Sequence, residues 1–141
     1  MYIRRKEWNG KTYHQLIAGG LVERHFLKKA GYALDQPRVL TLPGSIFTDD
    51  GVRLGESVIS TKRLSPVDYV SLVLAAAARY YSERAGEPVN TARDCKRVAK
   101  AQEHLEWIET CQHLHAAHGR ALYSRKYGFK RRRPSYARLY N

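Results

Sequence analysis

The chain has 141 residues, 43% of them hydrophobic, which suits one globular domain with a modest core and argues against wholesale disorder. Its 25 Lys and Arg against 13 Asp and Glu give a formal net charge of +12, which attracts nucleic acid, an anionic membrane surface or an acidic protein. No segment approaches the roughly 18 consecutive apolar residues that cross a bilayer, so we expect no membrane insertion.

The first 17 residues predict a β-hairpin. Asn9-Gly10 favours a type I′ turn, because both residues tolerate the positive φ angles that this turn needs. Lys11 to Ile17 would return alongside the first strand. In that first strand, two sets of residues alternate: Tyr2, Arg4, Lys6 and Trp8, and between them Ile3, Arg5 and Glu7. An isolated hairpin is marginally stable in water, so we expect one of its faces to pack on another element.

The next segments are shorter and less regular. Leu21 to Ala30 has the periodicity of a short amphipathic helix that ends at Gly31. Arg38 to Leu42 is compatible with a short strand that stops at Pro43-Gly44. Residues 52–59 fit either a further strand or an extended loop, so the sequence does not decide whether residues 32–64 form strands.

Two long helices are predicted in the second half of the chain. Ser65 and Pro66 favour a helix start, and the helix from Val67 to Ala85 is apolar almost all round, as in a buried core helix. Thr91 with Asp94 predicts the start of a last helix, from Ala92 to about Tyr127. On this helix one stripe of residues is expected to pack against the other helix: Val98, Ala101, Leu105, Ile108, Gln112, His115, Gly119 and Leu122.

These elements predict an α+β fold, mainly α. The N-terminal hairpin and short helix would pack on an antiparallel two-helix core (residues 65–86 and 91–127). Residues 1–128 would form a single domain, and residues 129–141 an Arg/Tyr-rich basic tail.

Three basic clusters are candidate nucleic-acid contacts. The hairpin cluster is Arg4, Arg5, Lys6 and Lys11, and the helical cluster is Arg93, Lys96, Arg97 and Lys100. The C-terminal cluster comprises Arg120, Arg125, Lys126, Lys130, Arg131, Arg132, Arg133 and Arg138, with Tyr127, Phe129 and Tyr136 interleaved. Arg binds phosphate through a planar fork, and aromatic rings stack on unpaired bases. The helical cluster also fits a solvated face, and the C-terminal one a solvated tail or a localisation signal.

The sequence contains no strong catalytic or metal-binding motif, so we expect neither an enzyme nor a cofactor. Cys111, His115 and His118 would share one helical face with His104, but no second pair has zinc-site spacing. Asp49-Asp50-Gly51 fits a turn better than a nuclease site. On one helix, Cys95 and Cys111 would be roughly 24 Å apart, so we expect free thiols. Free thiols indicate an intracellular, reducing compartment such as the cytoplasm or a nucleoid, or else a virion.

Residues Tyr2–Lys6, Asn9–Tyr13 and Gln15-Leu16 resemble the N-terminal hairpin of some insertion-sequence transposases over about 15 residues. No catalytic acidic triad follows, and no function is carried over. We therefore expect a non-catalytic subunit of a ribonucleoprotein, virion or mobile-element complex that grips RNA or DNA phosphates largely without regard to sequence. The alternative is a protein-interaction or inhibitor subunit whose basic surface docks on an acidic partner.

Overall fold

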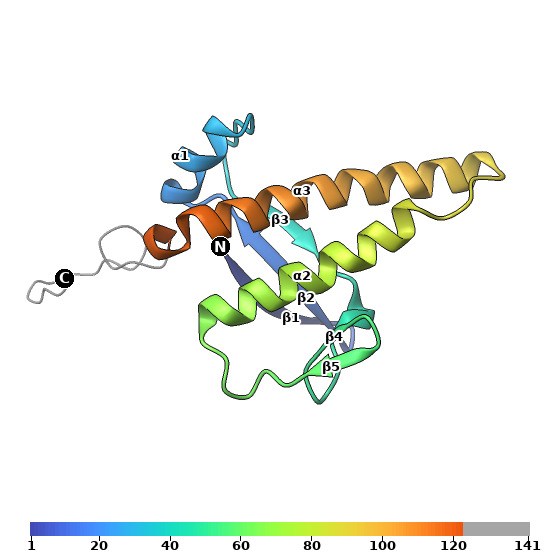
Figure 1. Cartoon of the computed structure of the whole chain (residues 1–141), viewed down its shortest axis with the longest axis horizontal. Coiled ribbons are helices and arrows are strands. Elements are labelled where there is room, and N and C mark those ends of the chain that lie inside the picture. The colour runs from blue at the N-terminus through green and yellow to red at the C-terminus, as the bar shows by residue number, and fades with distance from the viewer. Residues whose placement is uncertain (123–141) are drawn as a thin grey trace, which may run out of the picture.

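The structure, a computed structural model, describes the backbone of residues 1–122 and the side chains of residues 1–117. Its elements in chain order are the strands β1 (Tyr2–Trp8) and β2 (Lys11–Ala18), helix α1 (Leu21–Lys29), strand β3 (Arg38–Thr41), a single 3-10 turn (Gly44–Ile46), strands β4 (Val52–Leu54) and β5 (Ser57–Ile59), and helices α2 (Pro66–Ala85) and α3 (Ala92–Leu122). The predicted α+β class, with a hairpin packed on a two-helix core, is confirmed (Figure 1).

The three-stranded sheet has the order β1-β2-β3, with both neighbouring pairs antiparallel. The β1–β2 register ends at Trp8 opposite Lys11, and the turn residues Asn9 and Gly10 have φ angles of 52° and 75°, as a type I′ turn requires. Strand β3 pairs only with Gln15–Ala18. The outer half of the hairpin is therefore a two-stranded ribbon, and in the described part of the chain the outer edge of β1 pairs with no other strand.

Helices α2 and α3 form the predicted antiparallel hairpin (Figure 1). The Ser65 hydroxyl accepts a hydrogen bond from the Asp68 backbone N–H at 3.1 Å, which caps α2 beside its first residue, Pro66. Thr91 caps the start of α3 in the same way, through the Asp94 backbone N–H at 3.1 Å. The predicted end of the last helix, near Tyr127, lies outside the described residues.

The core lies between the helical hairpin and the inner face of the sheet. Leu16 and Leu40 contribute to it from the sheet, Val73 and Leu74 from α2, and Ile108 from α3. The predicted stripe on α3 is buried at Val98, Ala101 and Ile108 and half-buried at Leu105, Gln112 and His115. Among the α3 residues whose side chains are described, that stripe omits three other buried ones: Trp107, Cys111 and Leu114.

The contacts of Trp107 show why a single stripe of residues does not include the whole buried surface of α3. The Arg38 guanidinium of β3 lies 4.4 Å from its ring centroid, and the Tyr32 ring packs edge-on at 5.3 Å. Helix α3 also contacts α1. It therefore buries one side against α2 and another against the segment from α1 to β3.

Residues 32–64 do form strands. Besides β3, the short strands β4 and β5 pair antiparallel from Val52 opposite Ile59 to Leu54 opposite Ser57, and β4 packs against α2. Gly51 precedes β4 at a close approach, because a Cβ atom there would lie 2.0 Å from the Ile59 carbonyl oxygen. Within the described residues, no helix is both long enough and apolar enough to cross a membrane.

Candidate nucleic-acid interface

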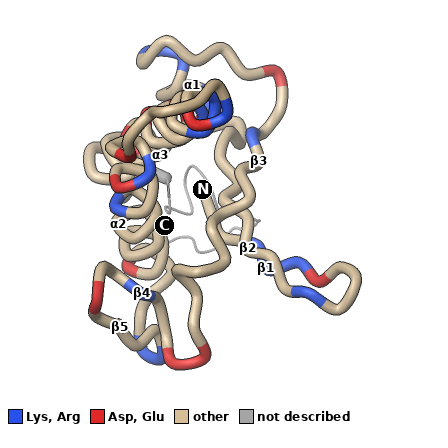
Figure 2. Tube along the Cα trace, turned by 90° about the vertical axis from the view of Figure 1, so that its right-hand side faces the viewer, with Lys and Arg blue, Asp and Glu red and all other residues tan. Residues whose placement is uncertain are grey.

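The exposed side of the sheet carries the best candidate site. Leu16 and Leu40 lie opposite one another and point into the core, so neighbouring register pairs point outward. The outward set of the hairpin includes Ile17, which is buried, and seven other residues that we call the outer face: Tyr2, Arg4, Lys6 and Trp8 of β1, with Lys11, Tyr13 and Gln15 of β2. Figure 2 shows the helices on one side of the sheet and the ribbon projecting away from them.

The outer face combines positive charge with exposed aromatic rings. Trp8 is 62% exposed and Tyr2 54%, and Arg4, Lys6 and Lys11 are all exposed. The Arg4 guanidinium donates two hydrogen bonds to Gln15 Oε1, at 2.6 and 3.1 Å, which orients it across the strands. The outer face contains no carboxylate, because strand alternation places Glu7 on the opposite side.

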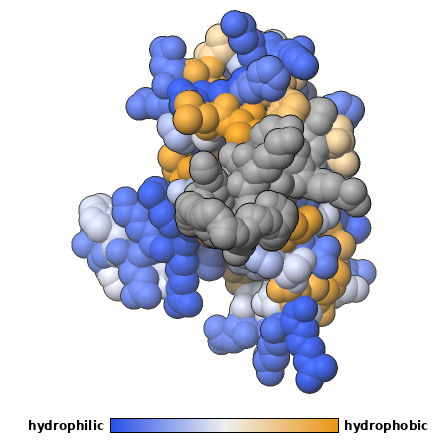
Figure 3. Space-filling model, turned by 90° about the vertical axis from the view of Figure 1, so that its left-hand side faces the viewer, coloured by the Kyte–Doolittle hydropathy of each residue, from blue (hydrophilic) through white to orange (hydrophobic). Residues whose placement is uncertain are grey.

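Hydrophobic side chains elsewhere on the surface are distributed differently from those of the outer face. Figure 3, viewed from the side opposite to that of Figure 2, shows hydrophilic side chains over the projecting parts and hydrophobic ones gathered nearer the middle. The exposed aliphatic residues of the described chain are dispersed: Leu21 on α1, Val39 on β3, Val58 and Ile59 on β5, and Val89 in the α2–α3 connection. Among the described residues, the two aromatic side chains that are largely exposed, Tyr2 and Trp8, both lie on β1. Scattered single apolar residues need no functional explanation.

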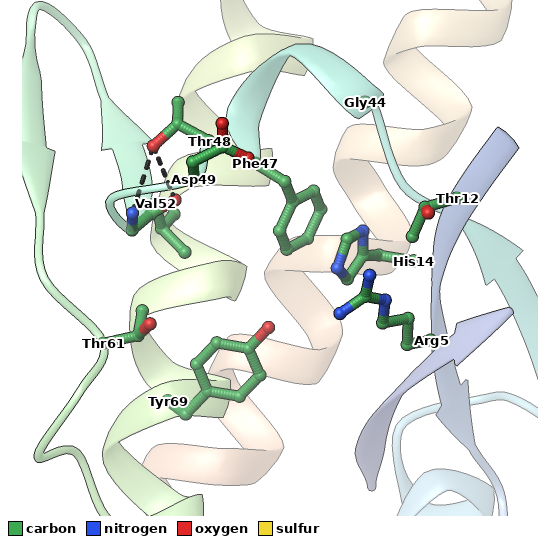
Figure 4. Close-up of a pocket in the computed structure, with 11 residues that line it drawn as sticks. Arg5, Thr12, His14, Gly44, Phe47, Thr48, Asp49, Val52, Thr61 and Tyr69 are labelled. Carbon is green, nitrogen blue, oxygen red and sulfur yellow. Dashed lines mark hydrogen bonds between the residues drawn. The ribbon is translucent and has the colours of Figure 1, made fainter. Parts of the chain in front are cut away.

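A polar cleft of about 410 Å³ lies behind the ribbon (Figure 4). Its lining includes Arg5, Thr12 and His14 from the hairpin, Phe47, Thr48 and Asp49 from the segment before β4, and Tyr69 from α2. The rings of His14 and Phe47 stack in parallel, with centroids 3.7 Å apart and planes 8° apart. This stack joins the ribbon to the body of the protein.

Charges in the cleft are nearly balanced. Burial, with a smaller effect from Arg5, lowers the pKa of His14, so its imidazole is neutral at pH 7. Burial raises the pKa of the Tyr69 hydroxyl, which stays protonated. Arg5 therefore contributes the one cationic side chain of the lining and Asp49 the one anionic side chain. Arg5, grouped by sequence with Arg4, Lys6 and Lys11, is separated from them by the thickness of the sheet.

The helical cluster is partly neutralised by ion pairs. Arg97 approaches Asp94 at 3.0 Å and Glu87 at 3.4 Å, and Lys100 approaches Glu103 at 3.2 Å. Arg93 and Lys96 are exposed on the same helix. The start of α3 lies at the far end of the helical hairpin (Figure 1), whereas the ribbon projects from the sheet on another side (Figure 2). These two clusters do not form one continuous surface.

The cysteine and histidine face of α3 is largely a packing surface. Cys111 is fully buried in the core, and burial raises the pKa of its thiol to about 12, which disfavours the thiolate that binds metals. His104 packs against Tyr81, with ring centroids 5.0 Å apart. The side chain of His118 lies outside those described. In the described part of the chain, no three His, Cys, Asp or Glu residues gather as a metal site would require.

The C-terminal cluster, Arg120 to Arg138 with its aromatic residues, also lies beyond the described side chains. Its contribution to charge follows from the sequence. Residues 1–117 hold 17 Lys and Arg against 13 Asp and Glu, a net charge of +4, whereas residues 118–141 hold eight Lys and Arg and no acid. Most of the net charge of +12 therefore lies after residue 117.

Two features of the site were missed by the sequence analysis. Trp8 and Tyr13 were left out of the candidate contacts, although the alternation of the first strand already placed Trp8 with Arg4 and Lys6. The cleft joins residues far apart in the chain, and no local pattern indicates it. No protein-family model, curated protein or solved structure matches the chain.

Proposed function

We propose that the protein is a non-catalytic nucleic-acid-binding subunit of a larger assembly, and that the outer face of its hairpin is a contact surface for phosphates. The observation that carries the proposal is the set of three exposed cations, Arg4, Lys6 and Lys11, on a sheet face without a carboxylate. Alternate residues of a strand lie about 6.8 Å apart, so the face offers positive charge at regular intervals. Regular spacing suits a repeating polyanion.

The C-terminal cluster supports the same function through charge alone. Eight Lys and Arg without an acid after residue 117 would add phosphate contacts of low sequence specificity. The helical cluster is a weaker candidate, because two of its four cations are already ion-paired.

An acidic protein partner is the second candidate function. Strand β1 lies at the edge of the sheet, where its outer backbone groups pair with no other strand of the described residues, and it carries Arg4, Arg5 and Lys6. An extended acidic peptide could add to this edge by backbone hydrogen bonds, with charge pairs to the three cations.

Charge reversal on the outer face tests the leading proposal. We expect Lys6→Glu with Lys11→Glu to weaken binding of a labelled oligonucleotide at least about 10-fold at low salt, and to lower the salt slope by about 0.7 per lost phosphate contact. The matched control is Lys28→Glu with Lys29→Glu on α1, which changes the net charge equally at exposed positions. A chain that ends at Leu122, measured alongside, reports the contribution of the residues that follow.

Equal effects of the two charge reversals would mean that only net charge matters, and would remove the outer face as a contact surface. Absence of binding by the full chain at low salt would overturn the proposed function itself. A native complex that persists after nuclease treatment and dissociates on β1 substitution would support the acidic-protein alternative.

A further inference from the structure

We infer that the outer face binds single-stranded nucleic acid, with unpaired bases stacked on Trp8 and Tyr13 and with phosphates held by the intervening cations. The inference rests on the proposed function and specifies its ligand. The Trp8 ring is largely exposed, so packing of the fold does not account for a large aromatic residue at this position.

Cross-strand packing accounts for little of this exposure. Trp8 lies opposite Lys11 in the last register pair of the ribbon, so no further pair lies beyond it. It remains 62% exposed, against 1% for Trp107 in the core. An aromatic ring left largely in water forgoes most of the free energy that its burial would provide, so a ligand that covers it gains that free energy.

The register alternates rings with cations over two rows. Trp8 of β1 faces Lys11 of β2, and one step inward Lys6 of β1 faces Tyr13 of β2. Each ring therefore has one cation opposite it and another two residues along its own strand. These are Lys11 and Lys6 for Trp8, and Lys6 and Lys11 for Tyr13. A nucleotide has the same two parts side by side: a flat base that stacks and a phosphate that takes positive charge.

The rings favour a single strand over a duplex. In a duplex, each base face is covered by the next base pair, so rings on a protein surface have no free base face on which to stack. Phosphates are present in both forms, and Arg4, Lys6 and Lys11 alone would not distinguish them. Stacking accepts every base, so the expected binding shows little sequence preference.

Affinity measurements with variants of Trp8 test the inference. The probes are oligo(U), oligo(dT) and a mixed duplex of equal length, titrated against the full chain at two salt concentrations. We expect both single strands to bind more tightly than the duplex, and Trp8→Leu to weaken single-strand binding roughly 10-fold while leaving duplex affinity unchanged. Trp8→Phe, which keeps a ring, should retain most of the affinity.

Leu21→Ala is the matched control, because Leu21 is an apolar residue 82% exposed on α1, and its removal should change neither affinity. Comparison of oligo(U) with oligo(dT) shows whether the ribose hydroxyl contributes. Thermal unfolding of each variant verifies that the fold is retained, as the exposure of both side chains leads us to expect.

Fluorescence provides an independent readout. Trp8 is exposed and Trp107 is buried, so Trp8 emits at longer wavelength and is the one accessible to iodide. Stacking should quench the long-wavelength emission on addition of oligo(dT) and protect it from iodide, and a duplex should do neither.

The inference would be overturned if single strand and duplex bound with equal affinity and Trp8→Leu changed neither affinity. The proposed function would still stand if Lys6→Glu with Lys11→Glu weakened binding in that case. If no outer-face variant changes the binding of either nucleic acid, the inference and the outer face as a contact surface are both overturned. Only a full chain that binds neither probe at low salt overturns the proposed function itself.

Discussion

Trp107 is the residue on which the packing of α3 most depends. It is almost fully buried, lies between Arg38 and Tyr32, and its indole Nε1 has no hydrogen-bond partner among the described residues. We expect Trp107→Ala to lower the free energy of unfolding by about 3–5 kcal/mol through the cavity it leaves. Trp107→Phe should cost less than about 2 kcal/mol, because it keeps a ring for both neighbours and removes a buried N–H that lacks a partner.

Urea unfolding of the two variants measures this difference. Equal destabilisation would mean that the indole volume, and not an aromatic surface for Arg38 and Tyr32, is what the site requires.

For individual residues, the sequence predicted turns and helix caps correctly, but it did not predict which face of the sheet or which part of the core a side chain occupies. Asn9-Gly10 and Ser65-Pro66 were identified correctly because a turn or a cap depends on a few adjacent residues. Arg5 was grouped with Arg4 because clusters were counted along the chain, whereas a strand sends adjacent side chains to opposite faces. Cys111 was expected to share a helical face with His104 and His115, but local spacing did not show that the core buries its thiol completely.

Among the elements, sequence periodicity did not predict the second buried side of α3 and did not decide whether β4 and β5 form. Helix α3 packs on two sides, so a search for one apolar stripe finds only part of its buried surface. Strands β4 and β5 have three residues each, too few for an alternating pattern to be recognised. The longer hairpin and the two long helices were predicted because each presents several turns or residue pairs of consistent pattern.

The β4–β5 hairpin depends on a glycine. We expect Gly51→Ala to destabilise the protein by at least about 2 kcal/mol, because the added Cβ atom would overlap the Ile59 carbonyl and the backbone must move. Gly44→Ala is the matched control, since no heavy atom lies within 4 Å of a Cβ atom there, and its effect should stay within about 0.5 kcal/mol. Thermal unfolding measures both, and similar melting temperatures for the two variants would show that the hairpin yields to the added carbon.

For the whole molecule, four groups whose pKa is lowered by burial give stability its pH dependence near neutrality. They are three half-buried imidazoles and the N-terminal amine, whose pKa is lowered from 8.0 to about 6. Burial is the largest cause that lowers the pKa of His14, His104 and His115 below the usual 6.5. Below that value the unfolded chain binds protons that the folded chain does not, so stability rises with pH and falls on acidification. The pKa values of Asp94 and Glu103 are lowered by hydrogen bonds and affect stability only at more acidic pH, near and below 4.5.

We therefore expect the midpoint of urea unfolding to fall from pH 7.5 to pH 5.5, and the fall to be smaller in His104→Gln, which removes one of the three imidazoles. A midpoint that is constant or rises over this range would contradict the proton linkage.

The outer edge of β1 also governs how copies of the protein meet in concentrated solution. Two β1 strands paired antiparallel about Arg5 would bring Arg4, Arg5 and Lys6 of one copy against the same residues of the other. Like charges directly opposite one another repel, so the edge resists intermolecular strand pairing and the aggregation that follows from it. A bound polyanion would cancel this repulsion. Copies crowded along one polymer would then be more prone to join edge to edge than copies free in solution.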